Sequence, residues 1–233
     1  MPSPLRPQAI ALLTRLGSGE TDQSIWNPLW DELYHQHAAL DACAALPSLA
    51  NAATNGMPAA RSEAIALAAG VLINAGAGNA EIRRRYATAI SALLHEAQSD
   101  LTRPADEDDY APQDFVGHLQ AVLAFEDQTS WASKLICLTD EELEIDCPTC
   151  GTAIVVALGR DGLFTCTVDY GLGRVASAAL VPADPKALTG IGARLHALAT
   201  AARQPATARQ LTALFGSGTC LPDGHHFVPG HEM

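Results

Sequence analysis

The sequence predicts a mainly helical protein with a small antiparallel β unit near its C-terminus. Three observations support this fold class. The composition is 48% apolar, rich in Ala and Leu, and only 5% aromatic, which favours close-packed helices over a β-sandwich. Apolar residues recur at helical spacing through residues 1–138. Beyond residue 139 an alternating pattern and a Cys-x-x-Cys turn appear, so we predict two domains, 1–138 and 139–233.

The first part is predicted to consist of successive helices. A short helix over 7–16 is followed by one that carries Trp26, Trp30 and Leu33, with Pro28 in its first turn. Asp41 is predicted to cap the next helix, which Pro47 kinks or restarts. Later helices are expected over 59–74, from Asn79 through Leu94, over 114–125 and over 131–138. Helix pairs of about 40 residues suggest a HEAT-like α-solenoid of antiparallel pairs.

The second part begins with a change of period. Glu142–Asp146 alternates polar and apolar residues, as a half-buried strand does. Cys147–Gly151 is a tight turn, and strands are predicted over 152–158 and 163–168. Two helices follow, over 185–202 and 206–215, before a short tail with one strand near Phe227. We therefore expect an antiparallel β unit with two packing helices.

The net charge of the chain disfavours two classes of binding partner, nucleic acids and anionic membrane surfaces. There are 26 acidic and 14 basic residues, which gives a net charge of −12. Nucleic-acid binding needs clustered Lys and Arg, and so does attachment to an anionic membrane surface, so neither is expected. The sequence shows no apolar run long enough to span a bilayer and no leader-like segment. Six Cys in such a chain point to reduced thiols and a cytoplasmic location.

The strongest chemical feature is a pair of related turns that suit a metal ion. Cys147 and Cys150 form a Cys-x-x-Cys turn, which supplies half of a tetrahedral zinc site. The tail contains Cys220, with Asp223 at the position where a second such turn would carry its other Cys. A carboxylate can ligate zinc, as can His225 or His226. We predict a Zn²⁺ site of the Cys₃Asp or Cys₃His type.

Other interpretations of these cysteines stay open. Cys147 and Cys150 can be ordinary turn thiols that bind no metal. A thioredoxin-like redox motif is less favoured, because such a motif opens a helix, whereas β-rich sequence follows these cysteines. If zinc binds, a structural role is favoured over a catalytic site with an open position. Cys43, Cys137 and Cys166 lie in apolar sequence and are expected to be small core residues.

Several of these residues also carry a family resemblance. They are the segment Trp30–Pro47 with His35-Gln36, the segment Leu143–Gly151, and Leu214–Gly216 leading to Cys220. Here the chain resembles a group of uncharacterised bacterial HEAT-like helical repeat proteins that end in a bipartite zinc-ribbon element. The resemblance implies the fold rather than an activity. The chain departs from the pattern at His37, where a Gly-containing turn is usual, and at Asp223, where a fourth Cys is usual.

A second candidate site lies near residues 26–41. The residues that suit a ligand pocket with aromatic walls are Trp26, Trp30, Tyr34, His35, Gln36 and His37, with Asp41 beside them. A histidine there can act as acid or base. The alternative is a helix–helix turn whose Trp rings fill the core, and we favour it. No residue is assigned a catalytic role.

The sequence therefore favours a non-enzymatic binding or scaffold module that presents a helical surface to an unidentified protein or peptide, and a basic partner is one option. Its acidic runs, 106–109 and 140–146, are either solvated surface or a docking face for such a partner. An enzyme of specialised metabolism, using the pocket near residues 26–41 or an open zinc site, is the first alternative. An immunity or regulatory protein that binds a basic partner is the second.

Overall fold

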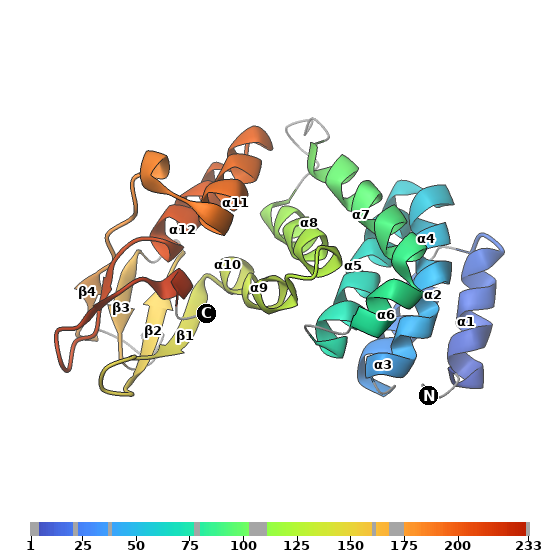
Figure 1. Ribbon diagram of the computed structural model, residues 1–233, viewed down its shortest axis with the longest axis horizontal. Coiled ribbons are helices and arrows are strands. Elements are labelled where there is room, and N and C mark those ends of the chain that lie inside the picture. The colour runs from blue at the N-terminus through green and yellow to red at the C-terminus, as the bar shows by residue number, and fades with distance from the viewer. Residues whose placement is uncertain are drawn as a thin grey trace. The chain divides into compact units, whose positions relative to one another are not determined.

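The computed structural model describes residues 5–20, 23–36, 39–76, 80–102, 111–159, 162–167 and 175–231. The chain divides into two compact units (Figure 1). One comprises Met1–Arg103 and Gly117–Ser133, and the other comprises Pro104–Val116 and Lys134–Met233. The predicted division into domains 1–138 and 139–233 stays a prediction. Across the described residues, no helix combines the length and apolar character needed to cross a membrane.

The mainly helical fold class is confirmed, and most helices belong to the first unit. Its elements are α1 (Pro7–Gly17), α2 (Gln23–Trp30), the π-helix η1 (Asp31–Gln36), α3 (Ala39–Ala42), the 3₁₀-helix η2 (Cys43–Ala45), α4 (Leu46–Asn55), α5 (Pro58–Ala75), α6 (Ala80–Arg85), α7 (Ala87–Thr102) and α9 (Thr129–Lys134). Helix α8 (Pro112–Phe125) contributes residues to both units. Each predicted helix in residues 1–138 therefore has a counterpart, although several are divided.

Two local expectations about helix starts are wrong. Pro28 lies in the interior of α2 rather than in its first turn, and the helix continues beyond Trp30 as the π-helix η1. Asp41 lies inside α3 and does not cap a helix. The chain instead tightens into η2, and α4 restarts with Pro47 in its first turn. Pro47 therefore restarts the helix, because a proline, which lacks an amide hydrogen, is best tolerated in the first turn.

The core of the first unit is built largely from small side chains. Helix α5 carries buried residues around its whole circumference, as expected of a helix surrounded by others. A Cβ at Gly70 would lie 3.2 Å from the rings of both Trp30 and Tyr34, so this glycine lets the π-helix approach α5 closely. Trp26 and Leu93 are among the fully buried large side chains. Alanine and glycine thus allow helices to pack at short range.

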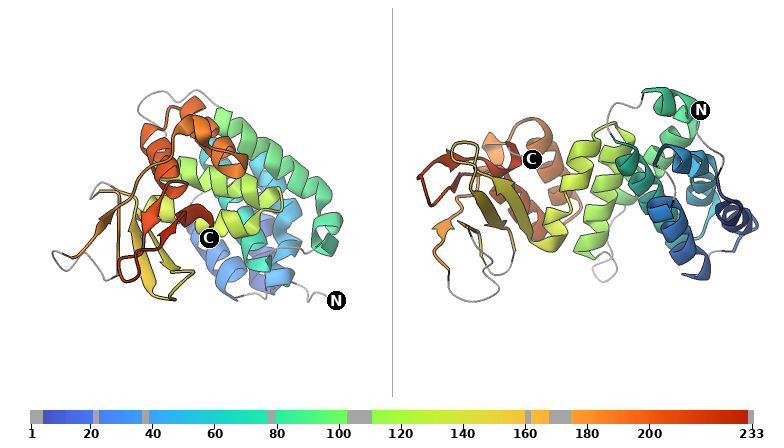
Figure 2. Two further views of the ribbon diagram at one scale, coloured as in Figure 1. Left: turned by 60° about the vertical axis from the view of Figure 1, so that its left-hand side comes forward. Right: turned by 90° about the horizontal axis from the view of Figure 1, so that it is seen from below.

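The second unit contains the predicted small antiparallel sheet. Its strands are β1 (Glu142–Asp146), β2 (Ala153–Ala157), β3 (Phe164–Cys166) and β4 (Ala178–Ala179), in the order β1-β2-β3-β4 (Figure 2). A separate hairpin pairs β5 (Gly218–Thr219) with β6 (His226–Phe227). The helical elements are α10 (Cys137–Asp140), the 3₁₀-helices η4 (Pro185–Ala187) and η5 (Pro229–His231), α11 (Gly190–Ala201) and α12 (Pro205–Leu214).

The sheet and the hairpin differ from the predicted elements at several points. The helix expected over 185–202 is shorter, because η4 is a separate 3₁₀ turn and α11 begins at Gly190. Strands β4 and β5 were not expected. The strand expected over 163–168 is shorter, since β3 ends at Cys166. An isolated bridge between Val181 and Ser217 links the segment after β4 to the segment before β5.

This bridge makes Gly216 the basis of a stability prediction. A Cβ at Gly216 would overlap the carbonyl oxygen of Val181 and lie 2.9 Å from the Cα of Pro182. The two hydrogen bonds of the bridge, Val181 N–H to Ser217 O at 2.9 Å and Ser217 N–H to Val181 O at 2.8 Å, would have to move. We expect Gly216→Ala to destabilise the second unit by about 1–3 kcal/mol in urea denaturation followed by circular dichroism.

Gly117→Ala is the matched control. A Cβ at Gly117 would meet no atom within 4 Å, and the residue lies inside α8, where alanine is the better helix former. That variant should be as stable as the parent or more stable. Equal losses in the two variants would contradict a specific clash at Gly216.

Candidate metal centre

The first half of the site is the tip of the β1–β2 hairpin. Asp146 pairs with Ala153, so the six residues from Cys147 to Thr152 form the turn. The backbone N–H of Cys147 donates to Thr152 O at 2.8 Å, and the N–H of Gly151 donates to Cys147 O at 2.9 Å. These two bonds fix the path of the turn between the two strands.

The second half is the tip of the β5–β6 hairpin, and it is built in the same way. The N–H of Cys220 donates to His225 O at 2.8 Å, and the N–H of Gly224 donates to Cys220 O at 2.8 Å. Each donor and acceptor therefore has a counterpart at the same spacing in the first turn. The two hairpin tips share one backbone design although their sequences differ.

The shared design fixes which residue of each turn corresponds to which. Gly151 and Gly224 both have φ of +70°, in the left-handed region that favours glycine. The residue before each glycine is Cys150 in one turn and Asp223 in the other. Asp223 therefore occupies the position of the second cysteine, as the spacing in the sequence predicted.

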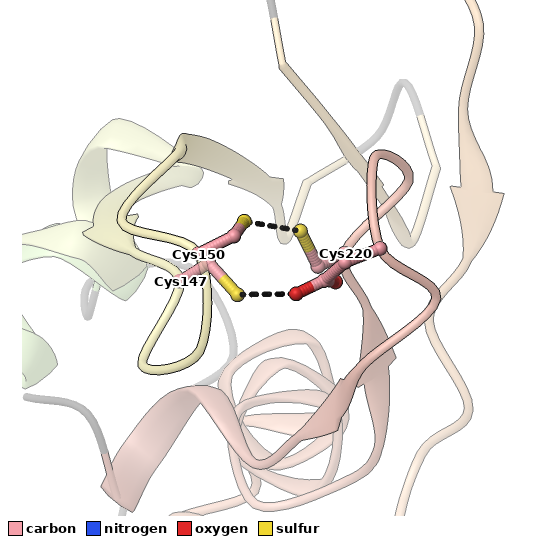
Figure 3. A group of neighbouring side chains, drawn as sticks. Cys147, Cys150 and Cys220 are labelled. Atoms are coloured by element: carbon pink, nitrogen blue, oxygen red, sulfur yellow. Dashed lines mark hydrogen bonds between the residues drawn. The ribbon is translucent and has the colours of Figure 1, made fainter.

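The two turns bring four ligand atoms together. The sulfurs of Cys147, Cys150 and Cys220 and a carboxylate oxygen of Asp223 all lie within 4.8 Å of one another. Figure 3 shows the two cysteines of the first turn facing Cys220 of the second. This cluster could hold a metal ion. All four are the residues that the sequence predicted as ligands.

Two separations between ligand atoms suit a tetrahedral ion. Cys150 Sγ lies 3.7 Å from Cys220 Sγ, and Cys147 Sγ lies 3.7 Å from Asp223 Oδ2. Zinc–sulfur bonds of about 2.3 Å and zinc–oxygen bonds of about 2.0–2.2 Å at tetrahedral angles place two sulfurs about 3.8 Å apart and sulfur and oxygen about 3.6 Å apart. The two separations match two opposite edges of such a tetrahedron, and all the ligand atoms lie within 4.8 Å of one another.

The carboxylate of Asp223 is oriented by its own turn. Its Oδ1 accepts a hydrogen bond from the N–H of His225 at 2.9 Å, which leaves Oδ2 on the side of Cys147. The same hydrogen bond lowers the pKa of Asp223, because it stabilises the ionised form. The group is therefore a carboxylate with one oxygen free for a metal.

The two histidines considered as alternative ligands are not in this cluster. Among the described residues, the group of mutually close ligand atoms contains Asp223 and neither His225 nor His226. The Nδ1 atom of His226 lies 3.1 Å from Thr219 Oγ1, on β5. The backbone of His225 orients Asp223, a role that the sequence did not suggest.

The four ligands divide into a buried pair and an exposed pair. Cys147 and Cys220 are buried, whereas Cys150 and Asp223 are exposed. Burial raises the pKa of the Cys220 thiol to about 12 in the metal-free protein. Hydrogen bonding with the side chain and backbone of Thr152, whose Oγ1 lies 3.2 Å from Cys150 Sγ, lowers the pKa of Cys150. Cys150 is thus the more acidic thiol of these two, and Thr152 is a supporting residue that the sequence analysis missed.

The remaining cysteines are core residues. Cys43, Cys137 and Cys166 are all buried. Burial raises the pKa of Cys43 to about 11 and that of Cys137 to about 12, so both stay neutral thiols at physiological pH. They are packed as small apolar side chains, in agreement with the sequence.

The second candidate site is only partly assembled. Trp26 is 1% exposed and fills the core instead of lining a pocket. The rings of Trp30 and Tyr34 meet edge to face at 5.8 Å, and Tyr34 meets His35 in the same way at 5.1 Å. The indole N–H of Trp30 donates to Glu63 Oε2 at 3.2 Å, a contact that the sequence did not indicate.

The rest of that predicted group contributes little to a site. His35 is exposed, and Asp41 lies on α3. Gln36 ends the π-helix η1, whereas His37 lies outside the described residues. The aromatic contacts resemble a packing arrangement between η1 and α5 more than a ligand pocket.

Comparison of the chain with protein-family models, with curated proteins and with solved structures finds no match. The conclusions about this protein therefore rest on its own residues and geometry.

Proposed function

We propose that this protein is a non-enzymatic binding or scaffold module whose second unit is held together by one structural Zn²⁺. The observation that carries the proposal is the pair of matched turns, which presents three thiols and a carboxylate at tetrahedral spacing. Soft thiolate ligands select zinc over magnesium or calcium, which take oxygen ligands. Four protein ligands fill a tetrahedral zinc ion and leave no position for a catalytic water.

The facing hairpin tips support a zinc-ribbon element. In such an element each of two β-hairpins contributes two ligands to one zinc ion. Here the β1–β2 hairpin contributes Cys147 and Cys150, and the β5–β6 hairpin contributes Cys220 and Asp223. This arrangement, together with the resemblance to bacterial HEAT-like proteins, motivates the assignment.

The first unit is proposed to form a HEAT-like solenoid that presents a binding surface. Consecutive helices contact one another, as α4 and α5 do, and α4 also contacts α1 and α7. Such layering of neighbours is how helical repeats build a continuous core. With a net charge of −12, the partner is proposed to be a basic protein or peptide in the cytoplasm, and neither nucleic acid nor a membrane.

The acidic run 140–146 offers a specific surface for that partner. Glu142, Glu144 and Asp146 alternate with Leu143 and Ile145 on β1, which is the edge strand of the sheet. Glu144 and Asp146 are exposed. Reversing all three charges to Lys should abolish binding of Lys- and Arg-rich peptides, measured by fluorescence anisotropy at physiological salt. Unchanged binding would exclude this strand as the docking face.

Metal analysis tests the zinc proposal directly. Protein reconstituted with Zn²⁺ and then desalted should contain about one zinc per chain by elemental analysis. Replacement by Co²⁺ should give the intense visible bands of a tetrahedral ion and sulfur-to-metal charge-transfer bands, because three thiolates bind. A chain that loses its zinc on desalting, or weak octahedral cobalt bands, would contradict the site.

A further inference from the structure

We propose that Cys150 is a peroxide-sensitive residue and that its oxidation joins it to Cys220 in a disulfide that expels the metal. This inference rests on the proposed zinc site and adds a modification to it. The substrate is hydrogen peroxide or an organic hydroperoxide. The geometry that carries the proposal is one exposed sulfur beside one buried sulfur on the opposite hairpin.

Exposure decides where the oxidant reacts first. Cys150 is the exposed thiol among the six cysteines of the chain, and the other five are buried. Its neighbour across the cluster, Asp223, is also exposed, so the metal is accessible from the side of these two ligands. Oxidation of cysteine follows exposure and thiolate character, and metal coordination keeps a thiol in its thiolate form. Peroxide therefore meets Cys150 before any other thiol.

Proximity decides what happens next. Cys220 Sγ lies 3.7 Å from Cys150 Sγ, and the two residues stand on different hairpin tips (Figure 3). A disulfide bond is about 2.0 Å long, so the two sulfurs must approach by about 1.7 Å. The turns are exposed at Cys150, which allows this small movement. Cys220 is thus placed to act as the resolving cysteine for Cys150.

The chemistry balances with peroxide as the oxidant. The Cys150 thiolate attacks one peroxide oxygen, the O–O bond breaks, and addition of one proton gives a sulfenic acid and water. The Cys220 thiolate then attacks the Cys150 sulfur, the S–O bond breaks, and hydroxide leaves and takes up a second proton as water. In total two thiolates, one peroxide and two protons give one disulfide and two waters. The two sulfurs are oxidised and the peroxide is reduced.

The disulfide leaves too few ligands to hold the metal. It consumes two of the three sulfur ligands, so Cys147 and Asp223 alone remain. Two ligands do not retain a structural zinc ion, which needs four. Oxidation of one thiol pair is therefore sufficient to release the ion.

Peroxide titration of the zinc-loaded, full-length protein tests this inference. Zinc release is followed with a chromogenic chelator, and the cysteines are mapped by differential alkylation and peptide mass spectrometry. We expect loss of the bound zinc together with two free thiols per chain, a Cys150–Cys220 cross-link, and recovery of zinc binding after reduction. Cys43→Ala, which removes a buried thiol of the first unit, should behave like the parent.

The outcomes separate the two proposals. A chain that never retains zinc overturns the metal site itself, before any peroxide is added. If the chain holds zinc, three results would overturn the redox inference and leave the metal site intact. Excess peroxide could leave zinc and Cys150 unchanged, or the cross-link could join Cys147 to Cys150. Cys150 could also form only sulfinic or sulfonic acid. Cys150→Ser is a second test variant, and Cys220 should form no cross-link in it. If Cys147 and Cys220 cross-linked in this variant at the rate seen in the parent, the redox inference would also be overturned.

Discussion

Cys220→Ser is expected to weaken zinc binding strongly and to destabilise the second unit while the first unit keeps its helices. Cys220 is fully buried, and its backbone N–H and C=O both hold the turn that carries Asp223. A structural zinc site contributes about 10–16 kcal/mol of binding free energy, roughly 3–4 kcal/mol for each of four ligands. Loss of one thiolate should therefore weaken zinc binding by roughly a hundred- to a thousandfold.

Two measurements check this result. Competition with a chelator of known affinity reports the dissociation constant for zinc. Hydrogen exchange followed by mass spectrometry reports protection in β1, β2, β5 and β6 separately from protection in α4, α5 and α7. We expect lost protection in the four strands and unchanged protection in the three helices.

Cys43→Ser is the matched control, because the chemical change is the same and Cys43 is also buried. It lies in η2, so it should keep the affinity for zinc even if the first unit loses some stability. Parent-like zinc affinity in Cys220→Ser would contradict the assignment of Cys220 as a ligand.

Zinc affinity is expected to fall steeply as the pH falls. Three thiols must lose protons before they bind zinc, so protons compete with the metal. Where all three thiols are protonated, each pH unit should change the apparent affinity by roughly a thousandfold. Because the pKa of Cys150 is lowered and that of Cys220 is raised, Cys150 ionises before Cys220 as the pH rises, and the slope decreases as thiols ionise.

The folding stability of the metal-free protein should depend on pH in the opposite direction, falling as the pH rises. Burial raises the pKa of Cys220 from 9.0 to about 12, which favours the neutral thiol in the folded state. This contribution to stability is present below pH 9 and is lost as the pH rises from about 9 to about 12. Urea denaturation across this pH range, with and without zinc, measures both the zinc-dependent stability and the stability of the metal-free protein.

Asp223→Asn is the control for the zinc titration. The pKa of Asp223 is lowered, so the carboxylate is ionised throughout the neutral range and releases no proton when zinc binds. The variant should bind zinc more weakly at each pH but with the same slope. A pH-independent affinity in the parent, or a slope that changes in this variant, would contradict a three-thiolate, one-carboxylate site.

The metal centre was the most predictable part of this protein. The patterns Cys-x-x-Cys-Gly in one turn and Cys-x-x-Asp-Gly in the other each lie within five consecutive residues. Such local patterns can be recognised in the sequence without knowledge of the fold. The alternation in Glu142–Asp146 located β1 for the same reason, because side chains on a strand point to opposite faces. What the sequence left open was the fourth ligand, since Asp223 and two histidines lie within four residues.

The parts that escaped prediction depend on contacts between distant residues. Strands β4 and β5 are two residues long, so no period can reveal them. They are defined by pairing with β3 and β6, respectively. Asp41 has the side chain of a helix cap, yet it lies inside α3. The contact between Trp30 and Glu63 joins residues 33 apart in sequence. The amino-acid composition does not indicate which distant residues will form such contacts.

The two turns also have a consequence for the unfolded chain. Cys150 and Cys220 are 70 residues apart in sequence, so any link between them closes a long loop. In the chain-entropy account, a permanent link of that span removes about 4 kcal/mol of conformational freedom from the unfolded state. A zinc ion held by both turns and a disulfide between the same residues would close the same loop. The oxidised, metal-free protein therefore keeps the topological restraint that the metal supplied, and reduction returns it to the same starting arrangement of hairpins.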